Sequence, residues 1–112
     1  MCGDYLTVHI SFKEAVKDEK QVSDISFEGD GCAILKASAS MMTDLLLGKT
    51  VKEIEGLFIL FQKIIHGEIN FSDDLGQVNI FSGLGRFPSR IQCAILPWDT
   101  LVKGMRAQCL TE

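Results

Sequence analysis

A strand pattern changes to a helix pattern near residue 31, and a short glycine loop separates the two. Residues 22–28 alternate between apolar and polar side chains, as expected for a strand that buries one face. Gly29 and Gly31 then interrupt the alternation, and residues 32–47 follow with small and apolar side chains at helical spacing. The chain must therefore pass directly from a strand into a helix that begins at Cys32.

This position favours chemistry at the Cys32 thiol. A helix N-terminus presents backbone N–H groups that have no partner inside the helix, and the macrodipole adds partial positive charge there. Both features stabilise a thiolate relative to a thiol. Cys32 is therefore a candidate for a reactive or metal-binding residue.

The segments before and after this transition predict a hairpin and a second helix. Residues 5–12 read as a strand that pairs with the strand of residues 22–28, because both are rich in β-branched and aromatic side chains. Gly48 is placed to stop the first helix. Thr50 opens a capping box, and an apolar residue recurs every three or four positions from there to residue 65. Gly67 marks the expected end of that second helix.

The order of these segments predicts an α+β fold. We expect residues 69–85 to form a surface loop with some local helix or strand, because glycines and acidic residues are scattered through it. The whole chain, residues 1–112, then forms a single domain. Its predicted architecture is a small antiparallel β-sheet of about three strands packed against helices.

Pro97 determines where we expect the last helix to start. A proline lacks one N–H and clashes with the carbonyl four residues earlier, so a helix tolerates it only near the first turn. That earlier carbonyl belongs to Cys93. We therefore expect a final helix over residues 94–102, with Cys93 at or just before its start, in the same kind of position as Cys32.

Charge and hydropathy exclude several classes of function. The net charge is −4 and no basic block offsets it, which argues against nucleic acid as a partner. No apolar run approaches the roughly 20 residues that a membrane span needs, and the first residues do not read as a secretory signal. We therefore expect a cytoplasmic protein without a membrane or nucleic-acid partner.

The four cysteines are Cys2, Cys32, Cys93 and Cys109, and none forms a Cys-x-x-Cys pair. In a reducing cytosol this count indicates a metal site or catalysis rather than disulfides. Side chains alternate along an extended segment, so Cys2 and Asp4 point to the same side and could reach one metal ion. Together with Cys32 and Cys93 they form a Cys₃Asp set that suits tetrahedral zinc, and an iron–sulfur cluster is also compatible.

Spacing alone leaves an alternative for each candidate. Cysteines are among the most buried residues, so the three candidate ligands could instead be core cysteines. Cys109 lies in a polar stretch with no partner motif, and we interpret it as a bystander. Arg90 precedes Cys93 by three residues and is either a site cation that favours thiolates or a solvated charge. His9 and His66 read as structural or surface residues.

Three segments of the chain resemble the SufU/IscU family of iron–sulfur cluster assembly proteins, whose domain is similar to the N-terminal domain of NifU. They are Cys-Gly-Asp at residues 2–4, Gly-Cys-Ala-Ile with Ala-Ser-Ala-Ser-Met-Met-Thr within residues 31–43, and Phe-Pro-Ser-Arg-Ile-Gln-Cys-Ala-Ile-Leu-Pro-Trp at residues 87–98. The segments follow the family order, and the resemblance extends over nearly the whole chain. It implies a SufE/NifU-like fold.

The SufU branch fits better than the IscU branch within this resemblance. IscU-type scaffolds carry a histidine ligand directly before the third cysteine, whereas this chain has Gln92 there. The longer segment before Phe87, and the presence of Arg90 and Trp98, also resemble the SufU type. Family members usually have an N-terminal helix and linker before the Cys-Gly-Asp motif, and we expect this helix to be absent here.

The resemblance implies a zinc ion held by Cys2, Asp4, Cys32 and Cys93 and, as the activity, zinc-dependent sulfur transfer. A SufS-type cysteine desulfurase would supply persulfide sulfur, Cys2 would accept it, and the sulfur would pass on to cluster assembly or target proteins. The alternative is a scaffold that assembles a [2Fe–2S]-type cluster on the same four residues and passes it to targets.

Overall fold

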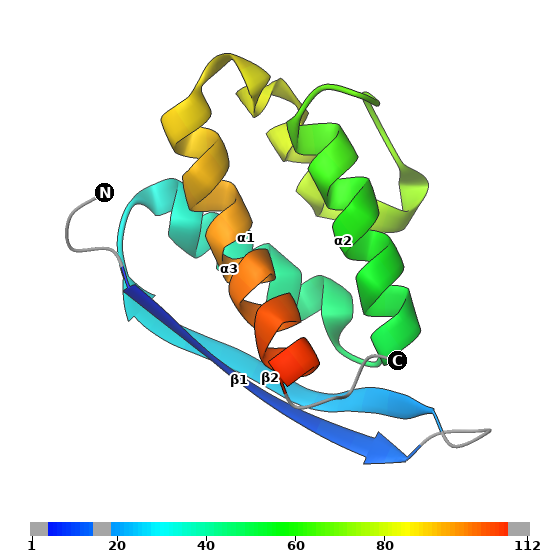
Figure 1. Ribbon diagram of the computed structural model, residues 1–112. Coiled ribbons are helices and arrows are strands. Elements are labelled where there is room, and N and C mark those ends of the chain that lie inside the picture. The colour runs from blue at the N-terminus through cyan, green and yellow to red at the C-terminus, as the bar shows by residue number, and fades with distance from the viewer. Residues whose placement is uncertain (1–4, 15–18, 108–112) are drawn as a thin grey trace.

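The computed structural model describes residues 5–14 and 19–107 (Figure 1). A β-hairpin opens the chain, and four helical elements follow it. In chain order the elements are β1 (Tyr5–Glu14), β2 (Lys20–Asp30), α1 (Ala33–Leu46), α2 (Val51–Ile65), the 3₁₀ segment η2 (Asp73–Arg86) and α3 (Pro88–Ala107).

The hairpin lies along one side of the molecule, and the helices pack against one face of the hairpin (Figure 1). β1 and β2 pair antiparallel from Tyr5 opposite Asp30 to Glu14 opposite Lys20, with one irregularity near Phe12. The predicted pairing and the α+β class are therefore confirmed. Within the described residues the sheet has two strands, whereas the prediction was about three.

The first two helices follow their capping signals. α1 starts after the glycine loop, with Cys32 at its N-cap, and Gly48 follows its end at φ 84°. At the start of α2 the Thr50 hydroxyl accepts a bond from the Glu53 N–H at 3.2 Å, and the Glu53 carboxylate accepts one from the Thr50 N–H at 2.9 Å. Gly67 adopts φ 81° just beyond α2. These four sequence predictions are confirmed.

The predicted loop of residues 69–85 contains the ordered segment η2. A break at Gly76, where φ is 52°, divides it into two short 3₁₀ pieces. Leu75, Val78 and Phe81 are its buried residues. After the break, Val78 and Phe81 are three residues apart, which matches the three residues per turn of a 3₁₀ helix and turns one side of the second piece to the core.

Helix α3 starts earlier than its sequence pattern predicted. It begins at Pro88, where a proline is tolerated because the first N–H groups of a helix have no intrahelical partner. Pro97, predicted at the first turn, is the tenth residue of the helix and is buried. The prediction was wrong because it applied the first-turn rule to the second of two prolines. Packing of the buried neighbours Trp98 and Leu101 offsets the helical bond that Pro97 does not make.

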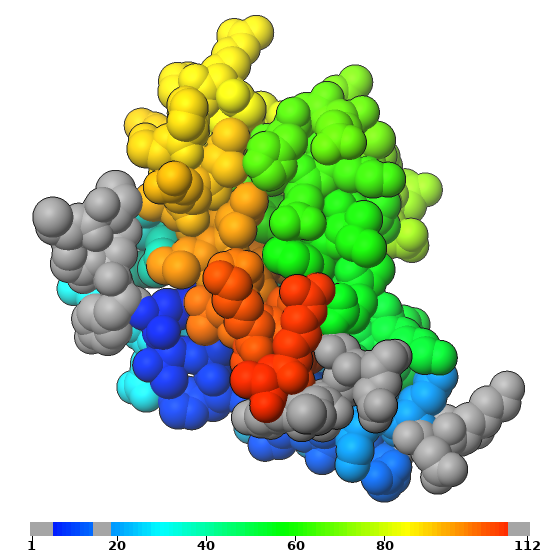
Figure 2. Space-filling view, viewed as in Figure 1, coloured from blue at the N-terminus to red at the C-terminus, as the bar shows by residue number. Residues whose placement is uncertain are grey.

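Aromatic rings join α2, α3 and η2 in the core. The Trp98 ring stacks on Phe61, with centroids 4.6 Å apart and planes at 20°, and Phe81 meets Phe61 edge-on at 6.3 Å. Trp98 and Phe61 are fully buried. Figure 2 shows the molecular surface over these elements, with α3 beside α2 and β1 against the C-terminal half of α3. In the described part of the chain, no helix is long and apolar enough to cross a membrane.

Candidate metal centre

Cys32 lies at the junction between the glycine loop and α1. Its backbone is extended, its side chain is half-buried, and its carbonyl accepts the first helical bond from the Lys36 N–H at 3.2 Å. Asp30 orders the loop: its Oδ1 accepts a bond from the Gly31 N–H at 3.0 Å and lies 3.4 Å from Lys36 Nζ. The predicted position of Cys32 at a helix N-terminus is confirmed, and this is a position that favours a thiolate.

Cys93 occupies a different kind of position from the one predicted. It is the sixth residue of α3, well inside the helix, and only 4% of it is exposed. The prediction placed it at or just before a helix start, and that error follows from the misplaced start of α3. Cys93 therefore owes its position to helix packing, without the N-terminal N–H groups that surround Cys32.

A side-chain hydrogen bond ties the helices that carry the two cysteines. Ser38 Oγ on α1 donates to the Ala94 carbonyl on α3 at 2.5 Å. Ala94 directly follows Cys93, and Ser38 comes six residues after Cys32. Figure 1 shows the first turns of α1, in cyan, lying beside the first half of α3, in yellow to orange. Both cysteines thus belong to the same end of the α1–α3 pair.

The start of β1 lies at this end of the molecule as well. Tyr5 pairs with Asp30, two residues before Cys32. The predicted ligands Cys2 and Asp4, and the predicted bystander Cys109, lie outside the described residues. Among the described residues, no three His, Cys, Asp or Glu side chains form a metal-binding group. The four-ligand set therefore stays a prediction.

Arg90 lies one turn before Cys93 on α3, and its side chain is exposed. Its guanidinium carbon lies 5.6 Å from the centre of the Phe87 ring, a cation–π contact on the surface. The role of Arg90 as a site cation stays a prediction. Gln92, directly before Cys93, is exposed too.

The two histidines have structural surroundings, as expected. His9 Nε2 on β1 lies 2.9 Å from the Glu28 carboxylate on β2, and both side chains are largely exposed. His66 is the C-cap of α2, and its Nδ1 lies 2.8 Å from the Gln62 carbonyl. These contacts account for both imidazoles.

Sequence analysis missed Ser38. In the sequence it is one of several small residues at helical spacing after Cys32, whereas in the structure this serine makes a hydrogen bond between helices. The available signal was its place between Leu35 and Met42 on the buried face of α1, because a polar residue there needs a partner.

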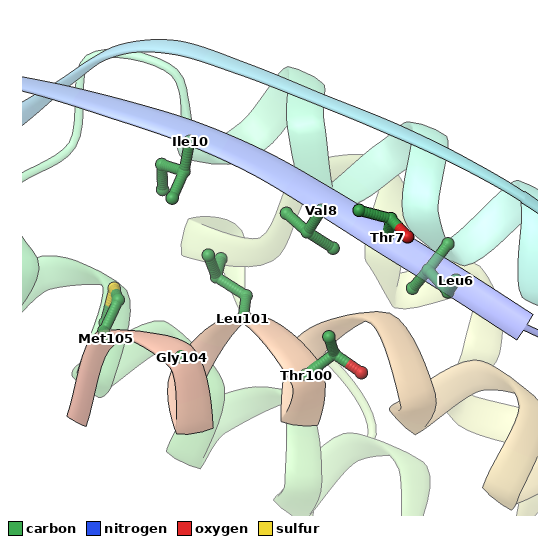
Figure 3. A pocket seen from close by; sticks show the side chains of 8 residues that line it. All are labelled: Leu6, Thr7, Val8, Ile10, Thr100, Leu101, Gly104 and Met105. Atoms are coloured by element: carbon green, nitrogen blue, oxygen red, sulfur yellow. The ribbon is translucent and has the colours of Figure 1, made fainter. Parts of the chain in front are cut away.

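A hollow of about 280 Å³ lies between β1 and the C-terminal half of α3. Figure 3 shows Leu6, Val8 and Ile10 on β1 facing Leu101 and Met105 on α3. None of the eight described residues that line it is Cys, His, Asp or Glu. It offers apolar contact and no metal ligand, and so it is separate from the cysteine site.

Comparison with known sequences identifies relatives along nearly the whole chain. The profile of the NifU-like N terminal domain matches residues 1–94. The iron-sulfur cluster assembly scaffold protein IscU of Streptococcus pyogenes serotype M1 is 36% identical over 116 residues, which cover 99% of this chain and 70% of that protein. The zinc-dependent sulfurtransferase SufU of Bacillus subtilis (strain 168) is 38% identical over 105 residues, which cover 93% of this chain and 68% of that protein.

One solved structure is similar to this chain in both fold and sequence. It is a candidate iron-sulfur cluster assembly scaffold protein for the SUF system from Fervidobacterium islandicum AW-1. It superposes with a TM-score of 0.78 at 32% identity, over 89% of this chain and 70% of that one. The predicted resemblance to the SufU/IscU family is therefore confirmed.

Proposed function

Because the chain belongs to the family of NifU-like N-terminal domains, together with IscU and SufU proteins, we propose that it serves iron–sulfur cluster assembly as a zinc-bound acceptor of persulfide sulfur. The observation that carries this proposal is the hydrogen bond between Ser38 on α1 and Ala94 on α3, which joins the helices that carry Cys32 and Cys93, while Tyr5 at the start of β1 pairs with Asp30. Its relative from Bacillus subtilis is a zinc-dependent sulfurtransferase.

The described residues fit a structural zinc ion at this end. Zinc favours thiolate ligands in a closed tetrahedral site. Cys32 brings a thiol from a helix N-terminus, and Cys93 brings one from a nearly buried position. Since Tyr5 pairs with Asp30, β1 begins close in sequence register to the loop that carries Cys32. We propose that Cys2 and Asp4 complete the set from there.

Cys2 is the proposed sulfur acceptor. Bound zinc would keep the cysteine ligands deprotonated and shield them from side reactions. The Cys2 thiolate attacks the terminal sulfur of a persulfide on the donor cysteine of a SufS-type desulfurase. The sulfur–sulfur bond of the donor breaks, a new one forms on Cys2, and the donor cysteine leaves as a thiolate. Sulfur then passes to downstream assembly or target proteins.

Arg90 is the proposed cation of the site. It lies one turn before Cys93 on the exposed side of α3, where a partner protein can reach it. A guanidinium there favours the thiolate form of nearby cysteines and attracts an anionic persulfide.

A scaffold for a [2Fe–2S]-type cluster is the second candidate, because the Streptococcus pyogenes relative, at similar identity, is named an iron-sulfur cluster assembly scaffold protein. Gln92 favours sulfur transfer over this candidate: an amide cannot replace an imidazole ligand, and its side chain is exposed. The metal content of aerobically purified protein separates the two. A colourless protein with about one zinc per chain supports sulfur transfer, whereas brown protein with iron and acid-labile sulfide supports the scaffold.

Desulfurase turnover tests the acceptor role directly. The wild-type protein should stimulate a SufS-type desulfurase, Cys2→Ser should abolish the stimulation, and Cys109→Ser should retain it. Equal stimulation by wild type and Cys2→Ser would remove Cys2 from the acceptor role.

A further inference from the structure

Ser38 is unusual within the core. Among the described residues it is the only polar side chain in the buried class, with none of its surface exposed. It shares the inner face of α1 with the apolar residues Leu35, Ala39 and Met42. A hydroxyl in such a place is costly unless it is hydrogen-bonded, and its partner is a backbone carbonyl of another helix.

The bond from Ser38 reaches α3 one turn before Pro97. A carbonyl oxygen has two lone pairs, so Ala94 can accept from Ser38 in addition to a helical N–H. Pro97 contributes no N–H to the hydrogen-bond ladder of α3 one turn further on. The bond from α1 therefore holds α3 within one turn of the position where its own ladder lacks an N–H.

Because the side chains around it are short, the Ser38–Ala94 bond can form only when the two helices lie close together. A serine hydroxyl reaches only a short way from its backbone, and Ala39 and Ala94 beside it are small and fully buried. The backbones of α1 and α3 must therefore approach closely for the 2.5 Å bond to form. If the bond is lost, larger separations of the two helices become accessible.

We infer that Ser38 is a positioning residue for the cysteine site. Its bond to Ala94 fixes the placement of Cys93, the residue next to Ala94, relative to Cys32, six residues before Ser38. This inference rests on the proposed metal site and adds to it a residue that does not bind the metal. It predicts that removal of one oxygen atom in the core weakens metal binding at the surface of the helix pair.

Two measurements on the full chain test the inference, one with metal and one without. Zinc affinity is measured by competition with a chelator, and the spectrum of the cobalt-substituted protein reports ligand geometry. In the metal-free protein, alkylation of Cys93 by iodoacetamide is followed by peptide mass spectrometry. Both are made where circular dichroism shows every variant folded, so that a loss of global stability does not change either result.

The control variant is Thr43→Ala, matched to Ser38→Ala. Thr43 Oγ1 donates to the Ser40 carbonyl at 2.8 Å, a hydroxyl-to-carbonyl bond that stays within α1. Ser38→Ala should weaken zinc binding about tenfold, in the range for outer residues that orient ligands. It should also change the cobalt spectrum and speed Cys93 alkylation severalfold. Thr43→Ala should leave all three unchanged.

Each other outcome is decisive. Unchanged zinc affinity and alkylation in Ser38→Ala, or equal losses in Thr43→Ala, would overturn the inference. So would a Ser38→Ala protein that does not fold while Thr43→Ala does, because the Ser38 hydroxyl would then serve the fold. If the wild type binds no zinc, the proposed function fails, and the alkylation rates alone decide whether Ser38 holds the helices together.

Discussion

The two halves of α3, residues 88–96 and 98–107, differ in what their side chains meet. In the second half, Trp98, Leu101 and Met105 are buried at helical spacing against α2 and the hairpin. In the first half only Cys93 and Ala94 are buried, and most of the other side chains are exposed or half-exposed. The second half thus supplies most of the apolar burial, while the first half supplies the Cys93 thiol.

This difference indicates a division of labour along one helix. Burial of large apolar side chains is the main source of folding free energy, so the second half should determine stability. A half that buries little can present functional groups without much cost to the fold. Variants on the two sides of Pro97 should therefore separate stability from metal binding and sulfur transfer.

Trp98→Ala should have the largest effect on the fold. The ring is fully buried and stacks on Phe61, so its removal should cost about 3–5 kcal/mol of unfolding free energy. Urea denaturation of the zinc-free protein measures this. Trp98→Phe is the control and should cost much less, because the indole Nε1 makes no hydrogen bond to any described residue. A loss below about 1 kcal/mol in Trp98→Ala would contradict the idea that the second half of α3 determines stability.

Cys93→Ser should have the largest effect on metal binding. Loss of one proposed thiolate ligand should weaken zinc about 100-fold or more, equivalent to about 2.7 kcal/mol, as measured by chelator competition. The zinc-free protein should stay folded by circular dichroism, because serine is close in size to cysteine. Cys109→Ser should bind zinc like the wild type. Unchanged affinity in Cys93→Ser would make Cys93 a core cysteine.

The parts of the fold that sequence analysis predicted are those with a local signal. The capping box at Thr50 and the glycine before Cys32 each specify an element boundary through neighbouring residues. The start of α3 has a local signal as well, Pro88 at its first position, but that role was assigned to Pro97 instead. The 3₁₀ segment did leave a signal, because Leu75, Val78 and Phe81 recur every three residues, but its glycines obscured it.

The sequence identified the residues of the candidate site but not how the fold places them relative to one another. The identity of Cys32 and Cys93 as candidates follows from their flanking residues. Their mutual placement depends on how α1 packs on α3, a contact between residues 56 positions apart, and no local pattern specifies it. The family resemblance supplied the ligand set, and the hydrogen bond between Ser38 and Ala94 shows how the helices that carry two of its members are joined.

The smallest effects come from two arginines on opposite halves of α3. Arg106 Nη2 lies 3.2 Å from the Glu55 carboxylate, whose other oxygen is buried and makes no hydrogen bond within the described residues. Arg106→Ala should cost about 0.5–1 kcal/mol of unfolding free energy, and less at high salt, because the arginine is largely exposed. It should leave sulfur transfer unchanged.

Arg90→Ala should do the reverse. Its contact with the exposed Phe87 ring contributes about 0.5 kcal/mol or less to stability, so urea denaturation should barely change. Sulfur acceptance from the desulfurase should slow about three- to tenfold, or about 0.7–1.4 kcal/mol in the barrier, because a cation near the thiolates is lost. Arg90→Lys should recover part of the rate, since it keeps the charge. If Arg90→Ala and Arg106→Ala slowed sulfur transfer equally, the net charge of the protein would explain both, and the two halves of α3 would not differ in function.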